Sequence, residues 1–257
     1  MKVLPVLILL VFQTAYGQKP RSALLKNMDK LWQLGTEQKN EGNYVQAENY
    51  FKQACLSTDS MIAILRDSSG RVRKRMHIKR GSFLFPKYPY FHSYDNLAEL
   101  YTISGNFEKA EQTYRTSIAR REDYFHRKSV HRTWPYVGLG KLYFATGDRE
   151  KAEAQFKLAA KLLESASTSG FNYDVLANEV YRYQCEINLS KGKTQQAWKY
   201  LDRYFLALNT TSYTSEQAAT AFDLKARYYL GIEDYENATL FLKKASKEVM
   251  AASQATY

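Results

Sequence analysis

The sequence contains few of the residues that several fold classes require. Two cysteines among 257 residues are too few for a disulfide framework or a four-thiolate zinc site. Twelve glycines and five prolines are few for an all-β chain, which needs many tight turns, and they favour helices instead. Hydrophobic residues make up 45% and charged residues 25% of the chain. This composition excludes wholesale disorder and a protein with many membrane spans.

Motifs for catalysis are missing as well. The sequence has no Gly-x-Ser-x-Gly elbow, no Gly-x-x-x-x-Gly-Lys loop and no Gly-x-Gly-x-x-Gly fingerprint. None of the four histidines stands in a His-Glu-x-x-His zinc motif. Cys55 and Cys185 fall at packing positions, and we expect both to be free thiols. We therefore predict a protein without catalytic activity, cofactor or metal; an enzyme with a site between helices is the weaker alternative.

The first residues have the features of an export signal. Lys2 precedes an apolar run from Val3 to Phe12, which is too short to span a bilayer, and Ala15-Tyr16-Gly17 supplies small residues before Gln18. We expect residues 1–17 to be a cleaved signal peptide and the protein to be periplasmic or secreted; an uncleaved anchor is the alternative. No cysteine follows the apolar run, so a lipoprotein anchor has no attachment residue.

One residue pattern recurs five times along the rest of the chain. A turn residue, usually glycine followed by Asn or Asp, precedes an Ala by five residues and a bulky apolar residue by nine. The five sets are Gly42, Ala47 and Phe51; Gly105, Ala110 and Tyr114; Gly147, Ala152 and Phe156; Gly192, Ala197 and Leu201; and Glu233, Ala238 and Leu242. The turn residue ends a first helix, the small Ala lets a second helix pack closely, and the bulky residue fills the space beside it.

This pattern resembles the tetratricopeptide repeat family. The resemblance implies an all-α fold, a right-handed solenoid of five stacked helical hairpins in one domain over residues 18–257, with repeats near 28–60, 91–124, 133–166, 178–208 and 219–250. Most of the turn residues lie about 42 residues apart, whereas the usual repeat of the family has about 34. The chain therefore resembles the long-repeat subgroup, also seen in kinesin light chains, in an exported bacterial form.

Positive charge is concentrated between and after the first two repeats. The chain has a formal net charge of +11, and residues 66–80 hold seven Lys or Arg against one Asp. These residues belong to a basic and aromatic insertion at 66–90, in which we expect a short strand or hairpin. A second basic segment, residues 115–132, follows in the next repeat. We expect the two segments to lie on one edge of the solenoid, where they either bind an anionic partner or are only solvated surface charge. The candidate residues of this anion-binding edge are Arg71, Arg73, Lys74, Arg75, Lys79, Arg80, Arg120, Arg121, Arg127 and Lys128.

The family resemblance also implies a concave groove lined by first-helix residues. Transferred by position, the candidate groove residues are Trp32, Thr36, His92, Asp95, Glu99, Ile103, Trp134, Val137, Lys141, Phe144, Glu179, Arg182, Glu186, Asp223 and Arg227. Trp134 is either the anchor of the interface or a packing residue between repeats. We expect an exported scaffold that binds a protein or peptide in this groove. The alternative is attachment to an anionic surface or glycan through the basic edge; nucleic acid is disfavoured as a partner because the protein is expected to be exported.

Overall fold

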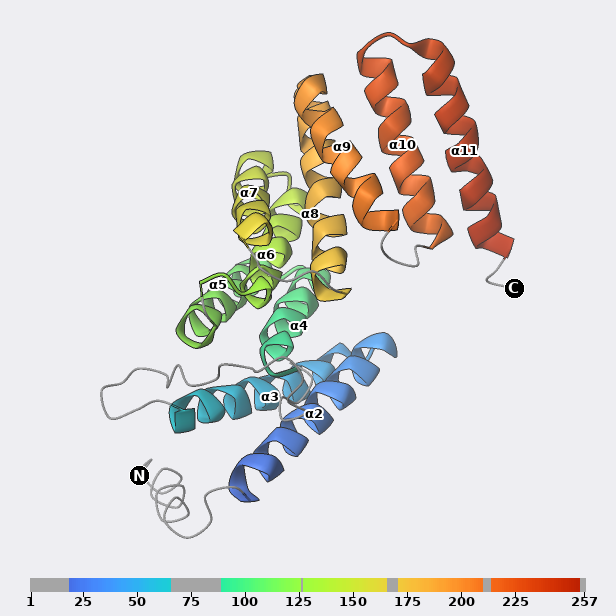
Figure 1. Cartoon of the computed structure of the whole chain (residues 1–257). Helices are drawn as coiled ribbons and strands as arrows, with labels where there is room; N and C mark the ends of the chain where they lie inside the picture. The colour runs from blue at the N-terminus through green and yellow to red at the C-terminus, as the bar shows by residue number, and fades with distance from the viewer. Residues whose placement is uncertain (1–18, 66–88, 126, 166–170, 210–213, 255–257) are drawn as a thin grey trace. The chain divides into compact units, whose positions relative to one another are not determined.

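The computed structural model describes residues 19–65, 89–125, 127–165, 171–209 and 214–254 (Figure 1). The signal peptide expected at 1–17 and the strand expected within 66–85 lie outside the described residues. By its internal contacts the chain forms two compact units, residues 1–125 and 126–257. Each unit is described by itself.

Every regular element among the described residues is a helix. The first unit contains α2 (Lys19–Asn40), α3 (Tyr44–Leu65), α4 (Pro89–Ile103) and α5 (Phe107–Tyr124). The second contains the short 3-10 helix η1 (Val130–Arg132), α6 (Trp134–Ala145), α7 (Arg149–Ser165), α8 (Phe171–Ser190), α9 (Thr194–Asn209), α10 (Ser215–Gly231) and α11 (Tyr235–Gln254). No described helix is both long and apolar enough to cross a membrane.

Consecutive helices pair as hairpins, so the predicted all-α repeat fold is confirmed. The pairs are α2 with α3 and α4 with α5 in the first unit, and α6 with α7, α8 with α9 and α10 with α11 in the second. First helices also contact one another, α2 with α4 and, in the second unit, α8 with both α6 and α10. Each unit therefore has a row of adjacent first helices.

The turn pattern explains why each hairpin forms. Gly42, Gly105, Gly147 and Gly192 have φ between 66° and 85°, the left-handed conformation that commonly ends a helix. Glu233 takes the same position with φ 62° and is the one described residue other than glycine with a positive φ. The residue that follows often caps the second helix.

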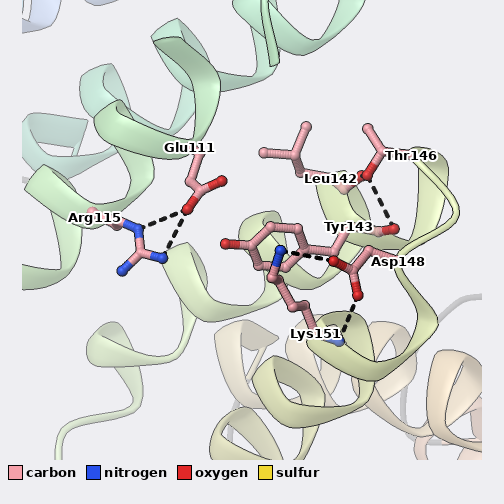
Figure 2. A network of polar contacts seen from close by, with 7 residues as sticks. All are labelled: Glu111, Arg115, Leu142, Tyr143, Thr146, Asp148 and Lys151. Carbon is pink, nitrogen blue, oxygen red and sulfur yellow. Dashed lines mark hydrogen bonds and ion pairs between the residues drawn. The ribbon is translucent and has the colours of Figure 1, made fainter. Parts of the chain in front are cut away.

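Figure 2 shows one of these turns, between α6 and α7. Asp148 Oδ1 accepts a hydrogen bond from the backbone N–H of Lys151 at 3.1 Å, and Asp148 Oδ2 lies 2.8 Å from Lys151 Nζ. These contacts with Lys151 lower the pKa of the Asp148 carboxyl group. A carboxylate at the start of a helix also satisfies backbone donors that have no partner within the helix. The Gly-Asp pair therefore ends one helix and starts the next.

The small and bulky positions of the pattern build the contact between the two helices. The five alanines of the pattern are at most 1% exposed. A Cβ atom added to Gly35 or Gly140 on a first helix would lie 2.6 or 2.8 Å from the ring of Phe51 or Phe156 on its partner helix. In the fifth hairpin Leu242 is 43% exposed and its neighbour Phe241 is 9% exposed. Phe241 stacks on Tyr229 at 5.6 Å, so it supplies the packed ring in place of Leu242.

Both cysteines are buried free thiols, as predicted. Cys55 lies on α3 of the first unit and Cys185 on α8 of the second. Burial raises the pKa of Cys185 to about 12 and raises the pKa of Cys55 well above its ordinary value. Thiols with such raised pKa values are poor nucleophiles, so both act as packing residues.

Candidate functional site

The candidate site of the second unit is the surface formed by its first helices. α6 carries Lys141 and Phe144, α8 carries Arg182 and Glu186, and α10 carries Asp223 and Arg227. Because α8 contacts both α6 and α10, the structure brings these predicted residues onto neighbouring helices. We call this surface the first-helix face; Glu179 on α8 completes it.

Charged groups of opposite sign are paired along the first-helix face. Glu179 Oε2 lies 3.4 Å from Lys141 Nζ and 3.5 Å from Arg182 Nη2. Arg182 Nη1 lies 3.9 Å from Glu186 Oε2, and Asp223 pairs with Arg227 at 3.8 Å. Three basic and three acidic groups therefore compensate one another. The side chains of these six residues are between 23% and 49% exposed, so the pairs are weak and can exchange partners.

Aromatic rings lie beside this charged row. Phe144 on α6 meets Tyr183 of α8 edge-on at 4.9 Å between centroids, and Tyr183 stacks on Phe156 of α7 at 4.7 Å. Guanidinium groups cover two of these rings: Arg149 Cζ lies 3.4 Å from the Phe144 centroid and Arg182 Cζ 3.9 Å from that of Tyr183. Sequence reasoning missed Tyr183 and Arg149, since neither occupies a first-helix position that the family pattern singles out.

Two other predicted residues of the second unit are less available than expected. Val137 is 5% exposed and belongs to the core of the unit, so it cannot line a groove. Trp134 begins α6 and is half-buried. Its position agrees with packing beside η1, which contacts α6.

In the first unit, α2 and α4 are joined by charged and polar groups. Lys39 Nζ of α2 lies 2.6 Å from Glu99 Oε2 of α4, and the side chains are 19% and 47% exposed. Trp32 is half-buried on α2, where its backbone carbonyl accepts a hydrogen bond from Thr36. Ile103, at the end of α4, is 52% exposed. The predicted residues Trp32, Thr36, Glu99 and Ile103 are all at least partly exposed, so they remain accessible to a partner.

Asp95 holds the second hairpin together and His92 lies beside it on α4, although the positions of both residues in the sequence predicted a binding groove. Asp95 Oδ1 accepts a hydrogen bond from Ser117 of α5 at 2.7 Å, and Oδ2 pairs with the guanidinium group of Arg121. His92 Nδ1 lies 3.7 Å from Asp95 Oδ2. Burial lowers the pKa of His92, against the opposing effect of Asp95. Ser117 is fully buried, so the Asp95 carboxylate is directed towards α5.

Arg121 was expected on the basic edge, but it is buried. Arg121 is 1% exposed. Its guanidinium group pairs with Asp95 and also lies 5.4 Å from the centroid of the Phe91 ring. Burial lowers the pKa of Arg121, and the charge of Asp95 opposes this effect. The physical reason is its position on α5, where it follows Tyr114 and Ser117 on the side that packs against α4.

The structure describes three of the remaining basic-edge residues. Arg71, Arg73, Lys74, Arg75, Lys79 and Arg80 lie outside the described residues. Arg120 Nε lies 2.7 Å from Asp59 Oδ1 and joins α5 to α3. Arg127 and Lys128 are exposed. Among the described candidates for the edge, only these last two are exposed to an anionic partner.

The described residues contain no group of three His, Cys, Asp or Glu side chains close enough to hold a metal ion.

Comparison with known proteins relates part of the chain to a repeat family. Residues 90–165, which run from α4 to α7, match the family model of the tetratricopeptide repeat. No curated protein matches the chain in sequence. The solved structure of BtubC (BKLC) from P. vanneervenii is 15% identical, with a TM-score of 0.66 over 94% of this chain and 86% of that one.

Two further structures support the same fold. TPR-like repeats assigned to a kinesin light chain of Podosopora anserina are 13% identical, with a TM-score of 0.56 over 88% of this chain and 96% of that one. MamA is 13% identical, with a TM-score of 0.51 over 89% of this chain and 95% of that one. The family model therefore identifies tetratricopeptide repeats in residues 90–165, and the solved structures show that the chain shares the all-α repeat fold.

Proposed function

We propose that the protein is a non-catalytic, exported scaffold that binds a protein or peptide partner along the first-helix face of α6, α8 and α10. The observation that carries this proposal is the row of compensated charges from Lys141 to Arg227. A partner with charges of both signs in matching order can replace these weak pairs one by one, at little electrostatic cost. A partner of the wrong charge order leaves groups unpaired, so the row provides specificity.

The proposal is tested by capture on the immobilised full chain and by two charge-reversal variants. Arg182→Glu places three carboxylates next to one another on α8, and we expect it to lose the captured partner. Lys161→Glu makes the same change of charge at an exposed position on α7, away from the first-helix face, and should keep it. Partner binding that is equal in both variants would show that the first-helix face is not the binding surface.

Export is tested separately, because the binding proposal does not depend on it. The gene is expressed in a bacterial host with a C-terminal tag, and the cells are fractionated. We expect the protein in the extracytoplasmic fraction with Gln18 as its first residue, as measured by mass spectrometry of the N-terminal peptide. An intact N-terminus in the cytoplasmic fraction would refute export and leave the binding proposal open to its own test.

A further inference from the structure

A second surface of the second unit, formed by α9, α10 and α11, combines aromatic rings with two lysines. α10 contacts both α9 and α11, and the three helices run side by side in Figure 1. We call it the aromatic–lysine surface; its residues are Trp198, Phe205, Phe222, Lys225, Tyr228, Phe241 and Lys244. Lys225 is two residues from Asp223 and two from Arg227 along α10, which places it about 200° around the helix axis from each of them. This surface is therefore separate from the first-helix face.

The rings of this surface form a connected layer across the three helices. Trp198 of α9 lies 4.8 Å from Tyr228 of α10, and Phe222 of α10 lies 6.1 Å from Phe241 of α11, measured between ring centroids. Phe222 also lies 6.1 Å from Phe205 of α9. Phe241 is 9% exposed, whereas Trp198 is 39% exposed. The layer is anchored in the core at Phe241 and open to solvent at Trp198.

Lys225 and Lys244 lie over these rings. Lys225 Nζ lies 5.7, 5.1 and 4.5 Å from the centroids of Trp198, Phe205 and Phe241. Lys244 Nζ lies 4.8 Å from the Phe241 centroid. Among the described residues, neither ammonium group has a carboxylate oxygen within 4.0 Å, although Lys141, Lys157 and Lys191 each have one.

The environment of Lys225 disfavours its positive charge. Burial lowers the pKa of Lys225, the positive charge of Lys244 lowers it further, and Asp202 opposes the shift. Rings contribute only a weak attraction to an ammonium group. A carboxylate placed between the two lysines would offset the repulsion between their ammonium groups, because it supplies a negative charge.

We propose that the aromatic–lysine surface binds an acidic, apolar peptide segment of a partner protein, with a carboxylate between Lys225 and Lys244 and an apolar side chain on Trp198. A single-stranded nucleic acid fits less well, because it needs several free ring faces for successive bases, and Trp198 is the one ring of the layer that is more than a third exposed. An anionic bilayer fits less well because Lys225 is half-buried among rings.

The test measures fluorescence anisotropy of labelled probes with the full chain. The main probe is a capped ten-residue peptide in which aspartate and leucine alternate, and the control peptide has lysine in place of aspartate. A labelled ten-nucleotide oligo-dT and vesicles with 30% phosphatidylserine represent the other partner classes. We expect saturable binding of the acidic peptide and no saturable binding of the other three probes. No binding of this peptide, or tighter binding of oligo-dT or of the vesicles, would overturn the proposal.

Two double variants then locate the binding site. K225M/K244M removes the two lysines of the surface, and we expect at least tenfold weaker binding of the acidic peptide. K243M/K247M removes the same charge from exposed positions of α11 and should change the affinity less than twofold. Equal weakening in both would mean that net charge alone attracts the peptide, and would refute the site.

Two further variants guard against misfolding and against confusion with the first-helix face. Lys244 is exposed, so K244M alone should fold and still weaken peptide binding about threefold; an unchanged affinity would contradict the proposal. Arg182→Glu should leave binding of the acidic peptide unchanged even where it abolishes capture of the partner. If Arg182→Glu weakens binding of the acidic peptide as much as K225M/K244M does, the aromatic–lysine surface is not the site.

Discussion

The buried guanidinium group of Arg121 allows a quantitative test of how the second hairpin is held together. Arg121→Met keeps much of the side-chain volume but removes the charge that faces Asp95 in the interior of the first unit. Asp95 keeps the hydrogen bond from Ser117 Oγ at 2.7 Å. Its other oxygen loses the cation that compensated it, and the contact of Arg121 with Phe91 is lost as well.

Removal of one partner from a buried ion pair costs about 3 to 5 kcal/mol, because the other charge is left uncompensated in the interior. The control lies on the same helix. Figure 2 shows Arg115 paired with Glu111, four residues earlier. The two groups lie 2.7 Å apart, and the side chain of Arg115 is 65% exposed. Such an exposed pair contributes about 0.3 to 0.5 kcal/mol. The loss in free energy of unfolding of the first unit should therefore be about ten times larger for Arg121→Met than for Arg115→Met.

Urea unfolding followed by Trp32 fluorescence measures this difference. Trp32 is the tryptophan of the first unit, so Trp134→Phe and Trp198→Phe in the background confine the signal to that unit. Adding Asp95→Asn to Arg121→Met should cost much less than the sum of the two single changes, with a coupling of at least about 1.5 kcal/mol. Equal costs for Arg121→Met and Arg115→Met, or strictly additive changes, would show that the buried pair does not stabilise the hairpin.

Three further predictions concern packing, thiols and pH. Gly140→Ala places a Cβ 2.8 Å from the ring of Phe156. The cost of overpacking, about 1 to 3 kcal/mol, should exceed the gain in helix propensity of about 1 kcal/mol, so we expect the variant to be less stable. Urea unfolding that shows a more stable variant would contradict this. Cys55 and Cys185 should resist a thiol reagent at pH 8 in the native state and both react in denaturant, since burial raises both pKa values; rapid native labelling would refute their burial. Burial lowers the pKa of His92 below its unfolded value of about 6.5, so near that pH the unfolded chain binds more protons than the folded one. The free energy of unfolding should therefore fall as the pH drops from 7 to 5, and it should fall less in His92→Gln. Identical pH profiles for both proteins would count against this effect.

The hairpins could be predicted from sequence because their determinants are local. A glycine with positive φ, a capping Asn or Asp, a small Ala and a bulky residue lie within about nine positions of one another, and each acts on its neighbours along the chain. The same local rules indicated which helix face meets which in each hairpin. They did not indicate that Phe241 would replace Leu242, since that choice depends on the ring of Tyr229 on the facing helix.

The roles of the charged residues were harder to predict, because a charge on a first helix faces whatever the neighbouring helix presents. Asp95 and Glu99 are four residues apart on α4, yet Asp95 meets α5 and Glu99 meets α2. One signal for Arg121 was present in the sequence. Ala110, Tyr114, Ser117 and Arg121 follow the spacing of a buried helical stripe, and all four are buried. A basic residue on such a stripe indicates a buried ion pair rather than an anion-binding edge.

The two surfaces of the second unit differ in how their charges are satisfied, and this difference supports different roles for them in the proposed binding. On the first-helix face, Glu179 and its neighbours already pair with groups of the opposite sign, so an ionic partner replaces existing contacts and gains little free energy from charge alone. On the aromatic–lysine surface, Lys225 and Lys244 contact the Phe241 ring and have no such pairs to break among the residues that the structure describes. An anion there adds attraction that salt would screen. The first surface is therefore suited to discriminate between partners, and the second to increase their affinity.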